Sequence, residues 1–175
     1  ETLVQAAAFL NDDTLIWLVG GTPEELPRIE KLVHERGCGR VKLVGYVPPG
    51  QIPTYLSAAD VLVLPNSARS VVSSYYTSPL KLFEYMAAER PIIASDLPAL
   101  REIIAHEETA LLVPPDDSSA IAAAVVRLRA DPALARRLVE NSRNVVAAHT
   151  WEKRATRIID FIQMSDNSPE IQAVG

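Results

Sequence analysis

The sequence predicts an α/β protein with a doubly wound parallel sheet and helices on both faces of that sheet. Short apolar runs of strand length alternate along the chain with longer amphipathic segments. The apolar runs contain few polar residues, which is typical of parallel strands that helices cover on both sides. The predicted strands span residues 14–20, 41–47, 60–65, 91–95 and 110–114.

Helix signals fill the segments between these strands. Thr22 and Glu25 form a T-x-x-E capping box, and Pro23 stands at the first helical position. Asp116 and Asp117 precede a run of small residues and are interpreted as the N-cap of another helix. One helix begins at Ser78, and the other predicted helices span residues 1–10, 22–37, 50–59, 98–105, 117–129, 132–148 and 151–163.

The first predicted helix begins at Glu1 with no capping residue and no strand before it. A parallel α/β sheet rarely opens in this way, so we expect a strand and a loop to precede Glu1 in the whole protein. No internal repeat or low-complexity linker divides the remainder. The sequence therefore predicts one domain over residues 1–163, lacking its first strand, and a frayed tail over residues 164–175. Trp17 and Trp151 are expected to pack in the core and between helices.

Composition excludes several classes of protein. The 175 residues are 48% hydrophobic and 22% charged, as in ordinary globular domains, and the net charge of -5 offers no general basic surface for nucleic acid. Cys38 is the only cysteine, which rules out an internal disulfide framework and fits a reducing, cytoplasmic compartment. No apolar run approaches the roughly 20 residues that span a bilayer.

Motifs for metals and common cofactors do not occur. The three histidines are scattered, and neither H-x-x-H nor C-x-x-C spacing is present, so no metal site is expected. No G-x-G-x-x-G follows a strand, and no G-x-x-x-x-G-K-[ST] occurs, which argues against a dinucleotide-dependent dehydrogenase and a P-loop NTPase. No cofactor is expected.

The stretch "SPLKLFEYMAAERPIIAS" (residues 78–95) carries the strongest functional signal. Proline at the first helical position wastes no hydrogen-bond donor, and the N–H groups of Leu80, Lys81 and Leu82 have no acceptor within the helix. The N-terminal end of a helix is partially positive and favours an anion, whereas the Lys81 side chain is itself positively charged. An anionic ligand would resolve that conflict.

Glu84 lies one turn further along the same helix, beside an apolar arc formed by Leu80, Leu82, Phe83, Met86 and Ala87. Its carboxylate could accept hydrogen bonds from a vicinal diol such as a ribose. A nucleoside diphosphate would then place its phosphates on the N–H groups and its ribose on the carboxylate. A surface pair between Lys81 and Glu84 is the simpler interpretation, and the residues alone leave both open.

The run "SPLKLFEYMAAERPIIASDLPALREII … ALLVPPDD" resembles the C-terminal half of the retaining glycosyltransferases of family 4 (glycosyl transferases group 1), which have the GT-B fold. "GYVPPGQIPTYLSAADVLVLP" and "TWEKRATRIIDFI" are similar to the segments on either side of it. The resemblance covers about residues 1–163. It implies a nucleotide-sugar-binding domain with a Rossmann-like sheet, which passes a sugar from a nucleoside diphosphate to an acceptor with retention of configuration.

The resemblance implies a role for each residue that matches the family pattern. Glu84 would bind the donor's ribose hydroxyls, and the backbone N–H groups of Leu80 and Lys81, next to Ser78, would hold the diphosphate. Val47 would meet the nucleobase through its main chain. Gly20 and Gly21 would line the nucleotide cleft, which is expected to open above Gly20, Val47 and Ser78. The family works without a bound metal.

Two departures from the family pattern limit the expected activity. Tyr76 stands eight residues before Glu84, where the family has a glutamate that contacts the donor sugar, so the catalytic group is unknown. In the family, basic residues that clamp the diphosphate lie in loops that would precede Glu1. The acceptor-binding domain lies earlier still. We therefore expect an N-terminal domain as partner, through which the protein could bind the inner face of a membrane. We expect no activity from residues 1–175 alone.

Two other classes of function stay open. A flavodoxin-like regulatory module, such as a phospho-receiver, needs acidic residues where strands end. Here the strands end at Gly20, Val47 and Pro65, and Asp60 opens its strand, which disfavours a receiver. A non-catalytic nucleotide-sugar-binding module remains, because Tyr76 replaces a residue of the reaction site.

Overall fold

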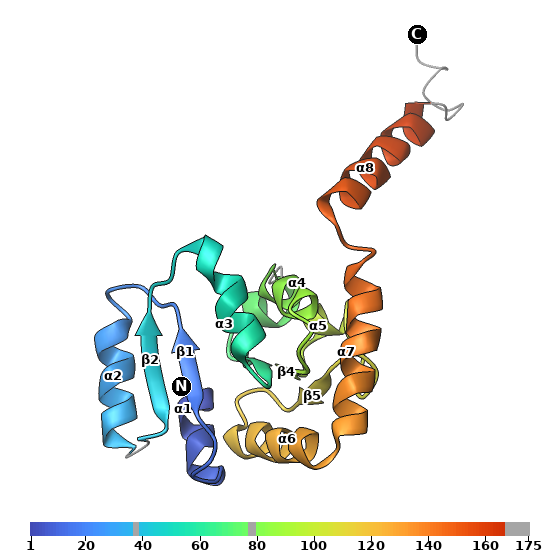
Figure 1. Ribbon diagram of the computed structural model, residues 1–175. Helices are drawn as coiled ribbons and strands as arrows, with labels where there is room; N and C mark the ends of the chain where they lie inside the picture. Colours follow the sequence, from blue (N-terminus) through green and yellow to red (C-terminus); the bar gives the residue numbers. More distant parts are fainter. Residues whose placement is uncertain (37–38, 77–79, 167–175) are drawn as a thin grey trace.

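The computed structural model describes residues 1–36, 39–76 and 80–166, and it shows the predicted α/β architecture (Figure 1). All strand pairs within this part of the chain are parallel, which confirms the fold class. The strands form two sheets in place of the one expected. One sheet pairs β1 (Ile16–Val19) with β2 (Val41–Gly45), and the other has the order β3 (Leu62–Leu64), β4 (Ile92–Ser95), β5 (Leu111–Val113).

Helices and turns connect the strands in the predicted alternation. The first predicted helix divides into α1 (Thr2–Ala6) and η1 (Ala7–Phe9), and the short helix before β3 begins as η2 (Pro49–Gln51). One element was not predicted, the π-helix η3 (Val72–Tyr76). The remaining helices are α2 (Leu26–Glu35), α3 (Ile52–Ala58), α4 (Leu80–Ala87), α5 (Pro98–Arg101), α6 (Ser118–Ala130), α7 (Pro132–Val146) and α8 (Trp151–Asp166).

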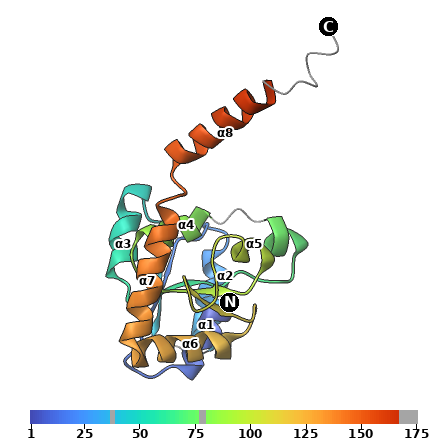
Figure 2. The same ribbon diagram turned by 90° about the vertical axis from the view of Figure 1, so that its right-hand side faces the viewer.

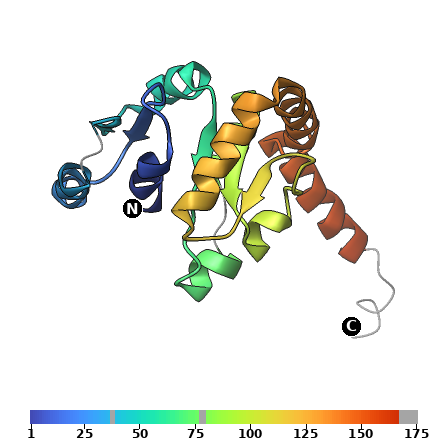
Figure 3. The same cartoon turned by 90° about the horizontal axis from the view of Figure 1, so that it is seen from below.

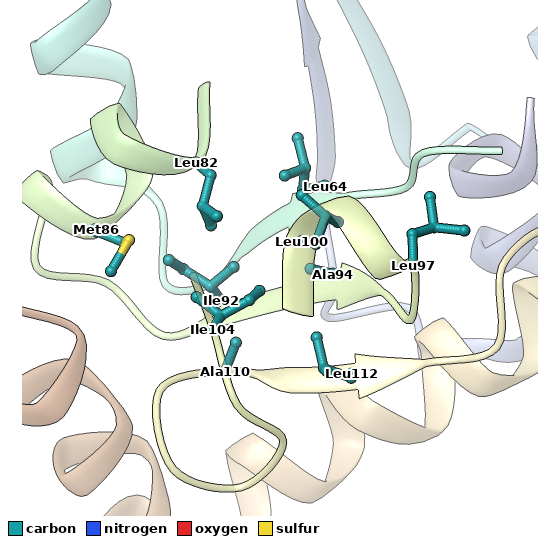
Figure 4. Close-up of a cluster of buried hydrophobic side chains, with 10 residues drawn as sticks. All are labelled: Leu64, Leu82, Met86, Ile92, Ala94, Leu97, Leu100, Ile104, Ala110 and Leu112. Atoms are coloured by element: carbon teal, nitrogen blue, oxygen red, sulfur yellow. The ribbon is translucent and has the colours of Figure 1, made fainter. Parts of the chain in front are cut away.

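Helices cover both faces of the β3–β5 sheet. Successive side chains of a strand point to opposite faces, so Ile92 and Ala94 pack on one side and Ile93 on the other. On the first face they meet α4 and α5 (Figure 4). The cluster drawn there consists of Leu64, Leu82, Met86, Ile92, Ala94, Leu97, Leu100, Ile104, Ala110 and Leu112. On the second face Ile93 packs with residues of α6, α7 and α1.

The β1–β2 sheet is covered less completely. Helix α1 packs on one face, where Val4 and Ala7 share a cluster with Ile16 of β1 and Ala122 of α6. On the other face Leu15 and Trp17 are each 49% exposed. Trp17 contacts Tyr55 of α3 with 6.0 Å between ring centroids, so the expectation of a core tryptophan is wrong. Figure 3 shows this sheet apart from the β3–β5 sheet.

Helix α8 extends away from the rest of the molecule (Figures 1 and 2). Trp151 is 73% exposed, so it does not pack between helices as expected. The helix continues to Asp166, beyond the end predicted at residue 163. Within the part of the chain that the structure describes, no helix has both the length and the apolarity needed to cross a bilayer.

Candidate functional site

Two glycine-containing turns meet where β1 and β2 end. The φ angles of Gly20, Gly21 and Gly45 are 102°, 103° and 75°, a region that favours glycine because it lacks a Cβ atom. The N–H of Gly20 donates to the carbonyl oxygen of Gly45 at 2.7 Å, which ties the two turns together. A Cβ atom on Gly21 would lie 3.1 Å from Leu26, so the turn packs tightly on α2. At the ends of β1 and β2, the two turns therefore present backbone atoms without bulky side chains.

Val47 follows β2 and is only 7% exposed. β2 ends at Gly45, two residues before the predicted end of the strand. With its side chain buried, Val47 could meet a ligand only through main-chain atoms. That arrangement fits the predicted contact to a base, which stays a prediction.

Helix α4 carries the predicted anion-binding turn and lies at the same end of the molecule as the tips of β1 and β2 (Figure 1). Its core face consists of Leu82 and Met86, which are 0% and 1% exposed. Leu80 is 60% exposed, so the expectation that it belongs to the core face is wrong. Its side chain stands in solvent beside the start of the helix, where first-turn N–H groups lack intrahelical acceptors. Ser78 lies outside the described residues.

Lys81 and Glu84 are both exposed on α4. In the described part of the chain no ion pair joins them or ties either of them to another residue. The surface pair is therefore not formed, and both charges are available to a ligand. Burial, and to a smaller extent the charge of Glu84, raises the pKa of Tyr85.

Tyr76 ends the π-helix η3 and is 76% exposed. It lies outside the core, and its ring centroid is 6.5 Å from that of Tyr75. η3 packs against α5, which holds this segment beside the end of β4. The serine-rich sequence has no clear hydrophobic period, so nothing in it indicated a helix here.

The N-cap prediction is correct for Asp117 and wrong for Asp116. The Asp117 carboxylate accepts from the N–H of Ala120 at 2.9 Å, which caps α6 and lowers the pKa of Asp117. The Asp116 carboxylate accepts instead from the hydroxyl of Ser67 at 2.9 Å and from the N–H of Ala68 at 3.1 Å. No sequence rule could have paired residues 67 and 116, because the contact depends on the order of the strands.

A cavity of about 590 Å³ lies elsewhere, at the amino ends of β3 and β4, between these strands and α7. Asp60, Arg90 and Pro91 line it, and none of the predicted site residues does. The open cleft above Gly20 and Val47 stays a prediction. Among the described residues no group of three or more His, Cys, Asp or Glu side chains could hold a metal ion.

Sequence comparison identifies relatives over most of the chain. The profile described as Glycosyl transferases group 1 matches residues 1–131. The alpha-D-kanosaminyltransferase of Streptomyces kanamyceticus is 32% identical over 152 residues, which make up 85% of this chain and 37% of that protein. The lipopolysaccharide core biosynthesis glycosyltransferase LpsD of Rhizobium meliloti is 34% identical over 146 residues, 83% of this chain and 40% of that protein.

Solved structures share the fold of nearly the whole chain. Sucrose-phosphate synthase (tll1590) from Thermosynechococcus elongatus gives a TM-score of 0.79 at 39% identity and covers 95% of this chain and 42% of that chain. Anabaena Alr3699/HepE in complex with UDP gives a TM-score of 0.79 at 18% identity over 93% of this chain and 44% of that chain, which shows the fold alone. This chain thus spans 37–44% of each of these four proteins. With the family profile matching residues 1–131 of 175, the chain belongs to the glycosyl transferases group 1 family.

Proposed function

We propose that the chain is the donor-binding part of a retaining glycosyltransferase of family 4. The whole enzyme would break the bond between a sugar's anomeric carbon and a nucleoside diphosphate and form a bond from that carbon to an acceptor oxygen. The observation that carries the proposal is helix α4, which presents Lys81 and Glu84 exposed and free of ion pairs in the described residues. Family membership and the structures of relatives with bound UDP and UDP-glucose support it.

The proposed nucleotide site uses the first turns of α4. The N–H groups of Leu80 and Lys81 and the Lys81 ammonium would bind the diphosphate, because a helix N-terminus and a cation both favour an anion. Glu84 would accept hydrogen bonds from the two ribose hydroxyls. One helical turn is about 5 Å along the axis, which roughly matches the distance from a β-phosphate back to its ribose.

The same groups would assist the departure of the leaving group. Negative charge grows on the diphosphate as its bond to the sugar breaks, and donors already in place stabilise that charge without reorganising. Gly20, Gly21 and the main chain of Val47 would border the base. Since Tyr76 has no carboxylate, it cannot act as the family's glutamate does, and no catalytic residue is assigned to this chain.

We further propose that a strand from the part of the protein before Glu1 completes the sheet between β1 and β3. In the described residues β1 pairs only with β2 and β3 only with β4, so each has an open edge. Helix α1 packs on both β1 and α6 and so links the two sheets. A strand that led into α1 by a right-handed crossover would lie beside β1, on the edge that β2 leaves open. The acceptor-binding domain would belong to the same proposed part before Glu1.

A second candidate is a non-catalytic nucleotide-sugar-binding module. Tyr76 favours it, because the resemblance places an acidic residue of the reaction site at this position. Both candidates bind a nucleotide sugar, and they differ in turnover. Sugar transfer by the whole protein would support the enzyme, and binding without transfer to any acceptor would support the module.

A thermal-shift screen with UDP, GDP and ADP tests the nucleotide site in either case. A nucleotide at 100 times its Kd should stabilise the folded chain by about 2.7 kcal/mol. The matching nucleoside without phosphates is the control, because it lacks the groups that α4 would hold. A folded chain whose Tm none of the three nucleotides raises would contradict the proposal.

A further inference from the structure

Asp116 links the loop after β5 to the loop after β3. Its Oδ2 atom accepts two hydrogen bonds, from the Ser67 hydroxyl at 2.9 Å and from the Ala68 N–H at 3.1 Å. The residues are 49 and 48 positions apart in the sequence, so this contact joins two separate connections of the sheet. Both connections leave the carboxyl ends of their strands, where ligands bind in parallel sheets.

The backbone of Asp116 supports a specific role for its side chain. Its φ angle is 60°, in the left-handed region, where glycine is the residue with no steric penalty. Aspartate tolerates this region better than most residues but still adopts it at some cost. The two hydrogen bonds from the facing loop to the Asp116 side chain offset the strain of its left-handed backbone.

The anchored loop continues by a chain of contacts towards Tyr76. The Ser67 hydroxyl accepts from the N–H of Arg69 at 3.2 Å, which closes a turn directly after the anchor. Ser74 is 8% exposed, and its N–H donates to the carbonyl oxygen of Ser70 at 3.0 Å. The hydroxyl of Ser74 reaches the carbonyl oxygen of Ala68 at 3.5 Å. These hydrogen bonds connect residues 67–68, which Asp116 holds, with Ser74 in η3, the helix that ends at Tyr76.

We propose that Asp116 is a positioning residue of the donor site, which holds the loop of residues 66–76 in its binding conformation before the nucleotide sugar arrives. This inference rests on the proposed function, since the loop leads into α4 and presents Tyr76 where the donor sugar is expected. Asp116 touches no ligand in this account. It acts by preorganisation, because a loop that is already ordered loses less conformational entropy on binding.

The test compares Asp116→Gly, Asp116→Asn and Ser67→Ala with the wild type. Glycine suits the backbone at residue 116 and removes the acceptor, so the fold should persist while the loop is released. Asparagine also tolerates the left-handed region and keeps one oxygen acceptor. Ser67→Ala removes a donor from the opposite side of the contact and leaves residue 116 unchanged.

Two readouts separate positioning from a general loss of stability. Amide hydrogen exchange at Ala68 and Arg69 reports the loop, and calorimetry with UDP and UDP-glucose reports the donor site. Asp117→Ala is the matched control, because it removes the cap of α6 and should lower overall stability without touching the loop.

The proposal expects faster exchange at Ala68 in Asp116→Gly, together with roughly 3- to 10-fold weaker binding of UDP-glucose. Asp116→Asn should stay near the wild type, and Ser67→Ala should speed exchange at Ala68 less than Asp116→Gly does, because the N–H of Ala68 can still donate to Asp116. Unchanged exchange and affinity in Asp116→Gly would overturn it, as would equal losses in Asp117→Ala. If the wild type binds neither UDP nor UDP-glucose, the proposed function fails, and the exchange at Ala68 still decides whether Asp116 holds the loop.

Discussion

The two sheets of this protein are built from similar sequences and are covered very differently. All four residues of β4 and all three of β5 are buried, whereas in β1 only Ile16 is, and Trp17 and Val19 are 49% and 37% exposed. The apolar runs look alike because a parallel strand that is buried on both faces consists almost entirely of apolar residues. The β1–β2 sheet therefore has an apolar face that the described residues cover only in part, next to the predicted nucleotide site.

The largest contrast should appear in core substitutions. Ile93→Ala removes a fully buried side chain at the centre of the three-stranded sheet and should lower the free energy of unfolding by about 3 kcal/mol. Leu15→Ala, beside β1, removes a side chain that is already 49% exposed and should cost about 1 kcal/mol or less. Urea unfolding measures both. Equal losses would mean that the β1 face is covered in solution and that the comparison is wrong.

Amide hydrogen exchange should sharpen the contrast within a single strand. The N–H of Ile16 donates to Arg40 and that of Gly20 to Gly45, on the side of β2. The alternation of a strand then directs the N–H groups of Trp17 and Val19 to the open edge. They should exchange about 100-fold faster or more than that of Ile93, which lies in the central strand of its sheet.

The proposed strand between β1 and β3 gives this experiment a second stage. In the whole protein, with the part before Glu1 present, the N–H groups of Trp17 and Val19 should become protected by pairing with that strand. Ile93 serves as the internal control, since its exchange should change little. Fast exchange at Trp17 in the whole protein as well would contradict the placement of the strand.

The smallest effect concerns an ion pair between the two regions. Asp13 precedes β1 and Arg129 belongs to α6, and the hydrogen bond from Arg129 lowers the pKa of Asp13 below its usual 3.8. A lowered pKa contributes stability that is present above about pH 4 and is lost as the pH falls through the folded-state value. Both side chains are more than half exposed, so the effect should be small. Thermal unfolding from pH 7 to 3 should show Asp13→Asn losing less stability than the wild type, and identical curves would show that the pair contributes nothing.

Sequence reasoning succeeded where local chemistry decides the outcome. Strand positions followed from apolar runs, and the cap at Asp117 followed from residue type and position. It failed where distant parts of the chain meet. The division into two sheets, the rotation of α4 that exposes Leu80, and the contact of Asp116 with Ser67 all depend on which elements lie side by side. The π-helix at residues 72–76 had no periodic signal to reveal it.

The proposed site could be outlined from the sequence and the resemblance because its groups lie close together on α4. What the sequence left open was whether Lys81 and Glu84 neutralise each other. The structure shows no ion pair between them in the described residues, and this favours the ligand over the surface pair.

Calorimetric titration of the wild type and Glu84→Ala with the nucleotide that gives the largest thermal shift is the most direct test of the account. Hydrogen bonds to a charged group contribute about 1.5–3 kcal/mol, so the substitution should weaken binding by roughly 10- to 150-fold. The fold should be as stable as before, because Glu84 is exposed and has no ion-pair partner among the described residues. Glu30→Ala, an exposed carboxylate on α2, is the matched control and should bind like the wild type. If Glu84→Ala binds with the same Kd as the wild type, Glu84 is a surface residue and the donor site proposed here is wrong.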